Sequence, residues 1–164
     1  MTETRETVAL FPASFDPPTN GHLDVARRAL QIFDRLVLAV AVNMSKQGTF
    51  TVDERLGMLR AEFGDEPRVE ITSFNGLTVD FAQQVNARVI IRGVRAMSDF
   101  EYEFEMALMN KRLYQDVETV FMLPSQEYMF VSSSRLKELV QFGRDVEEFV
   151  PPGVAKKLRE RFSR

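Results

Sequence analysis

Short apolar runs alternate with longer amphipathic segments along the chain. The run at 35–43 is apolar over most of its length, as expected of a parallel strand that is covered on both faces. Five runs of this kind are predicted to be strands: 8–11, 35–43, 69–74, 87–94 and 117–124. Their alternation with amphipathic segments predicts an α/β fold built on a parallel sheet.

Six segments have apolar residues at the spacing of an α-helix: 22–33, 51–63, 77–86, 98–114, 132–143 and 151–162. In the fourth, Phe100, Tyr102 and Phe104 alternate with glutamates, which is the periodicity of a strand. Ser98 and Glu101 nevertheless stand in capping-box register, and the later residues continue at helical spacing, so we predict a helix. Its apolar, partly acidic surface could pack on another subunit.

The length and order of these elements predict one domain over residues 1–164. No internal repeat, low-complexity tract or linker interrupts the series, and residues 1–6 form a polar tail that we expect to be poorly ordered. Parallel strands are joined by right-handed crossovers, so we expect five parallel strands with helices on both faces of the sheet. In such folds a ligand binds at the carboxyl ends of the strands.

Composition narrows the classes of function. Nucleic-acid binders usually carry a clearly basic face, whereas this chain has a net charge of −3. The absence of cysteine excludes disulfides and thiolate chemistry, and the single histidine excludes metal sites built on a histidine pair. The polar N-terminus is no secretory signal, and no apolar run is long enough to span a membrane. We therefore expect a soluble cytoplasmic protein without a nucleic-acid or membrane partner.

Candidate chemistry follows the first predicted strand. Ser14 supplies a hydroxyl, Asp16-Pro17-Pro18 makes a stiff turn, and Gly21 lets the backbone approach a ligand closely. His22 begins the next helix, where unpaired N–H groups favour anions, and its ring can donate to a phosphate oxygen. The alternative is that His22 merely caps the helix or packs under the loop. The neighbouring glycine, hydroxyl and strand end favour a ligand.

Cations follow two other strands: Lys46 after the second, and Arg92 and Arg95 at the fourth. Any one of them could be a solvated surface charge, but three at one sheet edge of an acidic chain favour a polyanionic ligand. After the fifth strand, Ser132–Ser134 lead into a helix. N-capping would need one serine, and three at a helix N-terminus are also consistent with a second phosphate-binding site.

Several common catalytic motifs are absent. The sequence contains neither a Walker A motif nor a G-x-G-x-x-G fingerprint. A Ser–His–Asp hydrolase could use Ser14, His22 and Asp16. These residues lie within nine positions of one another, however, and no G-x-S-x-G nucleophile elbow is present, so hydrolysis is disfavoured.

Two motifs carry a family resemblance. Thr19-Asn20-Gly21-His22 resembles the (H/T)-x-G-H signature of the nucleotidyltransferase superfamily, and Val131-Ser132-Ser133-Ser134 resembles its I-S-S-[ST] partner motif. The segments SFDPPTNGH, IIRGVRAMSDFEYEFEMALMNKRL and YMFVSSS are similar to the bacterial phosphopantetheine adenylyltransferase family, and the resemblance covers nearly the whole chain. It implies a Rossmann-like nucleotidyltransferase fold.

The resemblance also implies a reaction. AMP would pass reversibly from ATP to 4′-phosphopantetheine, giving dephospho-coenzyme A and pyrophosphate in the penultimate step of coenzyme A synthesis. The acceptor phosphate would attack the α-phosphate of ATP directly and in line. Mg²⁺ is expected through the ATP phosphates rather than through protein ligands. Family members are typically homohexamers, and coenzyme A is a feedback ligand in some of them.

Roles for individual residues follow from the same resemblance. His22 would hold ATP phosphates and stabilise the transition state, with Ser14, Lys46 and Arg95 as further catalytic groups. Phosphopantetheine would contact Ser14, Lys46, Thr78 and Arg92. The implied ATP site comprises Ser14, Phe15, His22, Gly93, Val94, Arg95, Glu103, Tyr128, Met129, Phe130, Val131, Ser132, Ser133 and Ser134.

One departure from the family pattern concerns the first loop. Ala13 stands where the family usually has glycine, and its methyl group could crowd a ligand or change the loop. Three rival functions remain open at this point. They are a sister adenylyl- or cytidylyltransferase for another phosphorylated acceptor, a nucleotide or coenzyme A sensor without turnover, and a scaffold protein with incidental surface cations.

Overall fold

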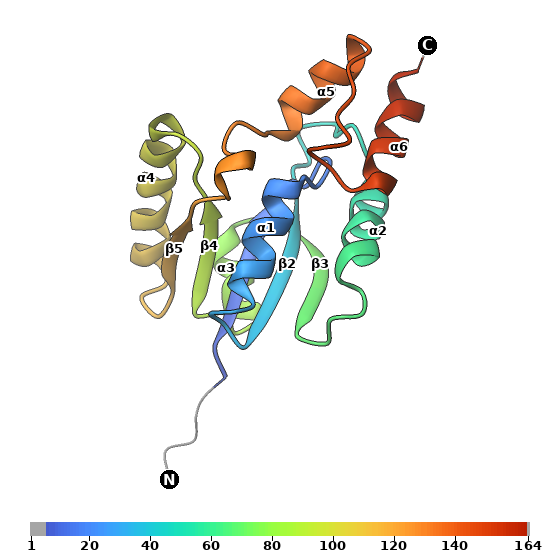
Figure 1. Cartoon of the computed structure of the whole chain (residues 1–164). Coiled ribbons are helices and arrows are strands. Elements are labelled where there is room, and N and C mark those ends of the chain that lie inside the picture. The colour runs from blue at the N-terminus through green and yellow to red at the C-terminus, as the bar shows by residue number, and fades with distance from the viewer. Residues whose placement is uncertain (1–5, 164) are drawn as a thin grey trace.

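The computed structural model describes residues 6–163 and contains one parallel five-stranded sheet (Figure 1). The strands are β1 (Val8–Ala13), β2 (Arg35–Val42), β3 (Val69–Asn75), β4 (Val89–Gly93) and β5 (Glu118–Met122), in the order β3-β2-β1-β4-β5. The predicted α/β class and all five predicted strands are confirmed. Apart from Glu6, the tail for which we expected poor order lies outside the described residues.

The helices are α1 (Asn20–Ala29), α2 (Val52–Phe63), α3 (Thr78–Gln84), α4 (Met97–Leu113), α5 (Ser133–Gln141) and α6 (Pro152–Phe162), with a short 3₁₀ turn, η1, at Gln126–Tyr128. All six predicted helices are present. The first begins two residues earlier than predicted, because Thr19 rather than a later residue is its N-cap.

Both faces of the sheet are buried, which explains the continuous apolar run of β2. Leu36, Leu38 and Val40 pack into one core with α1 and α2, whereas Val37 and Ala39 pack into a second core with α3. Side chains of a strand alternate between faces, so a strand covered on both sides must be apolar at every position. The predicted helices on both faces are thereby confirmed.

The helix α4 resolves the ambiguous segment of the sequence. It runs as one helix beside α3 and β5, and Phe100 packs against Phe121 of β5 with ring centroids 5.3 Å apart. Glu103 is its one buried residue, while Tyr102 and Phe104 are exposed. The strand-like alternation therefore arose because aromatic residues lie on an outer surface of the helix as well as toward the sheet.

The C-terminal helices place a second set of polar groups opposite the first loop. A third core, which includes Phe50 of the loop before α2 and Leu136 and Leu158 of α5 and α6, packs these helices onto the domain. The N–H of Asn20 donates to the carbonyl of Phe149 at 2.8 Å and ties α1 to this region. As a result, α5 lies beyond the carboxyl ends of the strands (Figure 1).

Within residues 6–163, none of the helices combines the length and the apolar character needed to cross a membrane.

Candidate active site

A cavity of about 480 Å³ lies at the carboxyl ends of β1 and β4, between the first loop, the start of α4 and the segment before α5. Such a volume suits a small-molecule ligand. Its lining contains eleven of the predicted site residues: Ser14, His22, Arg92, Gly93, Arg95, Glu103, Tyr128, Val131, Ser132, Ser133 and Ser134. The rule that ligands bind at the carboxyl ends of parallel strands thus located the cavity.

Six predicted residues lie elsewhere. Thr78 lines a second cavity of about 120 Å³, which shares Arg92, Tyr102 and Glu103 with the larger one. Lys46 is exposed on the loop after β2 and does not line either cavity. The remaining four are also absent from both linings: Phe15, Val94, Met129 and Phe130. Their proposed roles in binding remain predictions.

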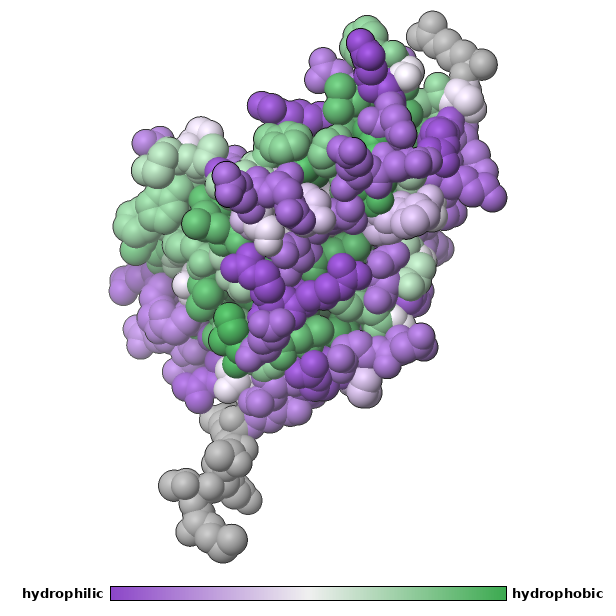
Figure 2. Space-filling view, in the orientation of Figure 1, coloured by the Kyte–Doolittle hydropathy of each residue, from purple (hydrophilic) through white to green (hydrophobic). Residues whose placement is uncertain are grey.

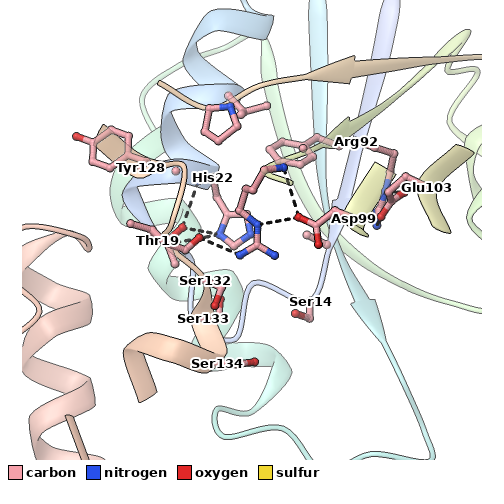
Figure 3. A pocket seen from close by; sticks show the side chains of 18 of the residues that line it. Ser14, Thr19, His22, Arg92, Asp99, Glu103, Tyr128, Ser132, Ser133 and Ser134 are labelled. Atoms are coloured by element: carbon pink, nitrogen blue, oxygen red, sulfur yellow. Dashed lines mark hydrogen bonds and ion pairs between the residues drawn. The ribbon is translucent and has the colours of Figure 1, made fainter. Parts of the chain in front are cut away.

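The single histidine both caps a helix and lines the cavity. Thr19 is the N-cap of α1, and its hydroxyl accepts a hydrogen bond from the N–H of His22 at 3.3 Å. In return, the ring Nδ1 of His22 accepts from the N–H of Thr19 at 3.0 Å, which completes a capping box. His22 therefore caps the helix and also lines the cavity, and its role toward a ligand stays a prediction (Figure 3).

His22 is held in its neutral form. Its pKa is lowered from 6.5 to about 4, first by burial and then by the nearby charges of Arg95 and Arg92. The ring of Phe15 packs edge-on against the imidazole, with centroids 5.0 Å apart. Although Phe15 does not line the cavity, it thus contributes to the apolar surroundings that keep His22 uncharged.

Buried polar contacts fix the loop that carries Ser14. Asp16 accepts hydrogen bonds from the N–H groups of Thr49 and Phe50, both at 2.8 Å. Arg55 lies 3.7 Å from Asp16 and donates to the carbonyl of Ser14 at 3.2 Å. The loop is therefore held by the segment before α2 as well as by its own prolines.

Arg92 is held by a buried carboxylate. Its Nε and Nη2 donate to the two oxygens of Glu103 at 2.7 and 2.6 Å, and its Nη1 donates to the carbonyl of Pro12 at 2.9 Å. The side chain of Glu103 is 11% exposed, so the pair is largely desolvated on that side. A bidentate pair of this kind fixes the plane of the guanidinium group.

Arg95 connects the start of α4 to the segment before α5. Its Nε lies 3.3 Å from Asp99, and its Nη1 donates to the carbonyl of Val131 at 3.0 Å. Both arginines of the cavity are thus paired with an acid and directed by a backbone carbonyl. The sequence left open whether each arginine was a solvated surface charge, whereas the observed contacts give both guanidinium groups fixed positions.

The three serines before α5 have three different environments. Ser132 is the N-cap, and its hydroxyl accepts from the N–H of Arg135 at 3.2 Å. The hydroxyl of Ser133 donates to the carbonyl of Pro17 at 2.8 Å and so joins the two loops. Ser134 makes no side-chain hydrogen bond to another residue within the described part of the chain. All three line the cavity, as Figure 3 shows.

Ala13 is the last residue of β1 and is accommodated without unusual backbone geometry. It pairs with Val40, lies outside the left-handed region of φ, and packs against the core formed with α1 and α2. The left-handed conformation in this loop belongs to Phe15, with a φ of 46°. The position therefore does not need a glycine for conformational reasons, although Ala13 also borders the cavity.

Sequence reasoning overlooked some residues that shape the site. Tyr102 borders both cavities and Asp99 holds Arg95, but their positions in an ambiguous helix gave no signal. Lys137 lies 3.5 Å from Asp16 and brings a charge from α5 to the first loop. The Thr19–His22 pair could have been found, because a threonine three residues before a possible acceptor is the spacing of a capping box.

The described residues, 6–163, contain no group of three or more His, Cys, Asp or Glu side chains placed to hold a metal ion. The two acids that line the large cavity, Asp99 and Glu103, are both engaged by arginines.

The fold agrees with comparisons to known proteins. The cytidylyltransferase-like family profile matches residues 10–139, so the chain belongs to that family of nucleotidyltransferases. A solved structure from Vibrio parahaemolyticus, assigned as a nicotinate-nucleotide adenylyltransferase, superposes with a TM-score of 0.70. The match covers 93% of this chain and 98% of the other at 17% sequence identity, which supports the shared fold.

Curated relatives define the family more narrowly. A phosphopantetheine adenylyltransferase from Staphylococcus carnosus is 49% identical over the full length of both chains. One from Heliobacterium modesticaldum is 51% identical, covering 95% of this chain and 93% of the relative. One from Carboxydothermus hydrogenoformans is 52% identical, covering 96% and 97%. The chain therefore belongs to the phosphopantetheine adenylyltransferase family.

Proposed function

We propose that this chain transfers AMP reversibly from ATP to 4′-phosphopantetheine, releasing pyrophosphate and forming dephospho-coenzyme A. The observation that carries the proposal is the meeting of His22, Arg92, Arg95 and three serines around one cavity in a chain of this family. Such donors suit two phosphorylated substrates that must be brought together despite their like charges.

ATP would occupy the large cavity. His22 and Arg95 would hold its phosphates, and the start of α5 would add the hydroxyls of Ser132 and Ser134 and backbone N–H donors. Anions are favoured at a helix N-terminus because its first N–H groups lack intrahelical partners. His22 would donate to a phosphate oxygen while remaining uncharged.

The acceptor would lie between the two cavities. Arg92 lines both, so it is placed to bind the acceptor's phosphate next to ATP. The smaller cavity continues along α4 past Met106 and Asn110 to Thr78. The pantetheine arm, an elongated amide, would run along this path. Lys46, on the loop after β2, would have to move toward the acceptor to join Arg92.

The chemistry requires no covalent intermediate. An oxygen of the acceptor phosphate would attack the α-phosphorus of ATP, the new P–O bond would form, and the bond to the β-phosphate oxygen would break. The nucleophile is already an anion, so no strong base is needed. The main contributions would be positioning and charge stabilisation in the transition state. ATP would be used as its Mg²⁺ complex, with the ion entering as part of the substrate.

The test is pyrophosphate release by the purified full chain with Mg²⁺ and ATP, with and without 4′-phosphopantetheine. Release that depends on this acceptor supports the proposal. Equal or faster release with another phosphorylated acceptor would identify a sister transferase instead. ATP binding without release under any of these conditions would support the sensor. Adding coenzyme A to the same assay tests whether it inhibits the reaction.

A homohexamer is the second part of the proposal. Apolar side chains gather over α4 and the adjoining β5 edge (Figure 2). Five side chains of α4 are between 47% and 63% exposed: Tyr102, Phe104, Leu108, Met109 and Leu113. Contiguous apolar surface of this kind is typical of a protein–protein contact. Burying it against other copies would remove it from water and complete the surroundings of the smaller cavity.

Light scattering coupled to size-exclusion chromatography tests this assembly. Leu108→Glu should lower the oligomeric state, because it places a charge in the apolar contact. Ile32→Glu is the matched control, since Ile32 is 65% exposed but lies in the turn after α1, away from α4 in the sequence. A monomeric wild-type chain would contradict the hexamer without affecting the proposed reaction.

A further inference from the structure

Thr19 contacts His22 in a way that reaches beyond helix capping. The N3 position of a capping box is usually Glu or Gln, whose oxygen accepts from the N-cap N–H. Here the acceptor is the ring nitrogen Nδ1 of His22, at 3.0 Å from the N–H of Thr19. The hydroxyl of Thr19 also lies 3.1 Å from the same nitrogen. One residue thus surrounds one edge of the imidazole with two polar groups.

These contacts determine where the imidazole carries its proton. A main-chain N–H can only donate, so the Nδ1 that receives it must present a lone pair. A neutral imidazole has one N–H, which must then be on Nε2. The Thr19 hydroxyl accepts from the N–H of His22, so its own proton can also point toward Nδ1. Neither the Nδ1–H form nor the doubly protonated ring is compatible with this arrangement.

The opposite ring nitrogen is directed to the cavity. Within residues 6–163, every buried side-chain nitrogen or oxygen has a hydrogen-bond partner. Nε2 of His22 has no such partner there, so it must be accessible, and His22 lines the large cavity. Thr19 itself is only 2% exposed, and the ring of Phe15 packs against the imidazole. The ring is therefore held at its Nδ1 edge by Thr19, which also borders the cavity, while Nε2 stays accessible.

We propose that Thr19 is a positioning residue that fixes His22 as the Nε2–H tautomer, with this proton directed at the substrate phosphates. The proposal rests on the proposed function for its catalytic consequence. In the other tautomer, Nε2 would present a lone pair to phosphate oxygens and repel them. A donor that is already oriented requires no rearrangement as charge develops in the transition state. The hydrogen bond made by one ring nitrogen commonly sets the protonation of the other.

The first experiment measures the tautomer directly by two-dimensional ¹H–¹⁵N NMR of the full chain labelled at histidine. The chain has one histidine, so its ring signals need no assignment by mutation. At pH 7 we expect a single neutral form, with Nδ1 unprotonated and Nε2 protonated. Signals of the Nδ1–H form, or averaging between the two forms, would overturn the proposal. The measurement requires no turnover, so it is independent of the proposed function.

The second experiment compares variants of two threonine caps. Thr19→Val should lower kcat about tenfold, the scale of one lost hydrogen bond, and leave the KM for ATP nearly unchanged. Its NMR spectrum should keep the Nε2–H tautomer, because the main-chain N–H that donates to Nδ1 remains, but the Nδ1 signal should shift with the loss of the hydroxyl contact. Thr19→Ser should keep the wild-type spectrum and kcat. Thr51→Val is the matched control, because Thr51 caps α2 through the same kind of capping box with Glu54, outside the cavity.

Two results would contradict the role of Thr19. One is a wild-type spectrum and kcat in Thr19→Val. The other is an equal loss of kcat in Thr51→Val, which would indicate a general effect of helix capping. If the wild-type chain has a fixed Nε2–H tautomer but transfers no AMP, the proposed function fails while the tautomer assignment stands.

Discussion

Glu103 binds two nitrogens of Arg92 through its two carboxylate oxygens, and this pair stands where the two cavities meet. A guanidinium group has five N–H donors. Glu103 and the carbonyl of Pro12 take three, which leaves two for a ligand. Arg92 is thus fixed in orientation but not saturated. This arrangement leads us to expect that it binds the acceptor's phosphate rather than serving only the fold.

Arg92→Ala should raise the KM for 4′-phosphopantetheine at least tenfold, since it removes a charged hydrogen bond, and should change the KM for ATP much less. Steady-state kinetics with each substrate varied in turn provide the measurement. Equal effects on both KM values would contradict the assignment of Arg92 to the acceptor.

Arg92→Ala will also cost stability, because it leaves the buried carboxylate of Glu103 without its partner. The control is the double variant Arg92→Ala with Glu103→Gln, which removes the unpaired charge. It should recover part of the lost free energy of unfolding but none of the acceptor affinity. Recovery of both would mean that Arg92 acts mainly through the fold.

His22→Ala should lower kcat by about a hundredfold or more, the scale of losing one oriented donor in a transition state. It should also cost about 1 kcal/mol of stability, because the side chain completes the cap of α1. His22→Gln separates the two effects. Its amide oxygen can accept from the N–H of Thr19 and restore the cap, while kcat should stay well below that of wild type. Normal turnover in either variant would refute the mechanism.

The sequence predicted the sheet, the helices and the edge that holds the cavity, because these depend on periodic patterns. The alternation of Leu36, Val37 and Leu38 between two cores is a direct consequence of strand geometry. His22, Arg92 and Arg95 came together because their strands are parallel and end at the same edge. Local pattern and topology were sufficient for these assignments.

Pairwise contacts between distant segments could not be predicted in the same way. The pairing of Arg92 with Glu103 and of Asp16 with Lys137 depends on side-chain directions in the folded chain. The exposure of Lys46 likewise follows from the path of its loop, for which no periodic pattern exists. The sequence identified the charged groups, whereas the fold determined which of them were already paired.

The lowered pKa of His22 predicts a pH dependence of stability. The unfolded chain binds a proton at this residue below about pH 6.5, but the folded chain does so only near its pKa of about 4. Between these values the unfolded state carries more protons, so the free energy of unfolding falls as the pH is lowered. The loss amounts to up to about 3 kcal/mol and does not increase further below pH 4.

Urea titrations at a series of pH values test this dependence, with His22→Gln as the reference. The carboxylates are common to both proteins, so their contribution cancels in the difference. The difference in unfolding free energy should change between pH 6.5 and 4 and stay constant above pH 7. A constant difference throughout would mean that His22 has an ordinary pKa in the folded chain.

A larger side chain at Gly93 should fill part of the proposed ATP site without removing any charged group. It lines the large cavity at the end of β4, and a Cβ atom added there would meet no other atom within 4 Å. Its φ is not in the left-handed region, so a larger residue can adopt the same backbone. Gly93→Leu should therefore raise the KM for ATP at least tenfold, because its side chain would occupy space that the nucleotide needs, while the thermal unfolding temperature stays close to wild type.

Gly57→Leu is the matched control: Gly57 also has no atom within 4 Å of an added Cβ, but it is exposed on α2. If Gly93→Leu binds ATP as tightly as Gly57→Leu, the nucleotide does not use this cavity.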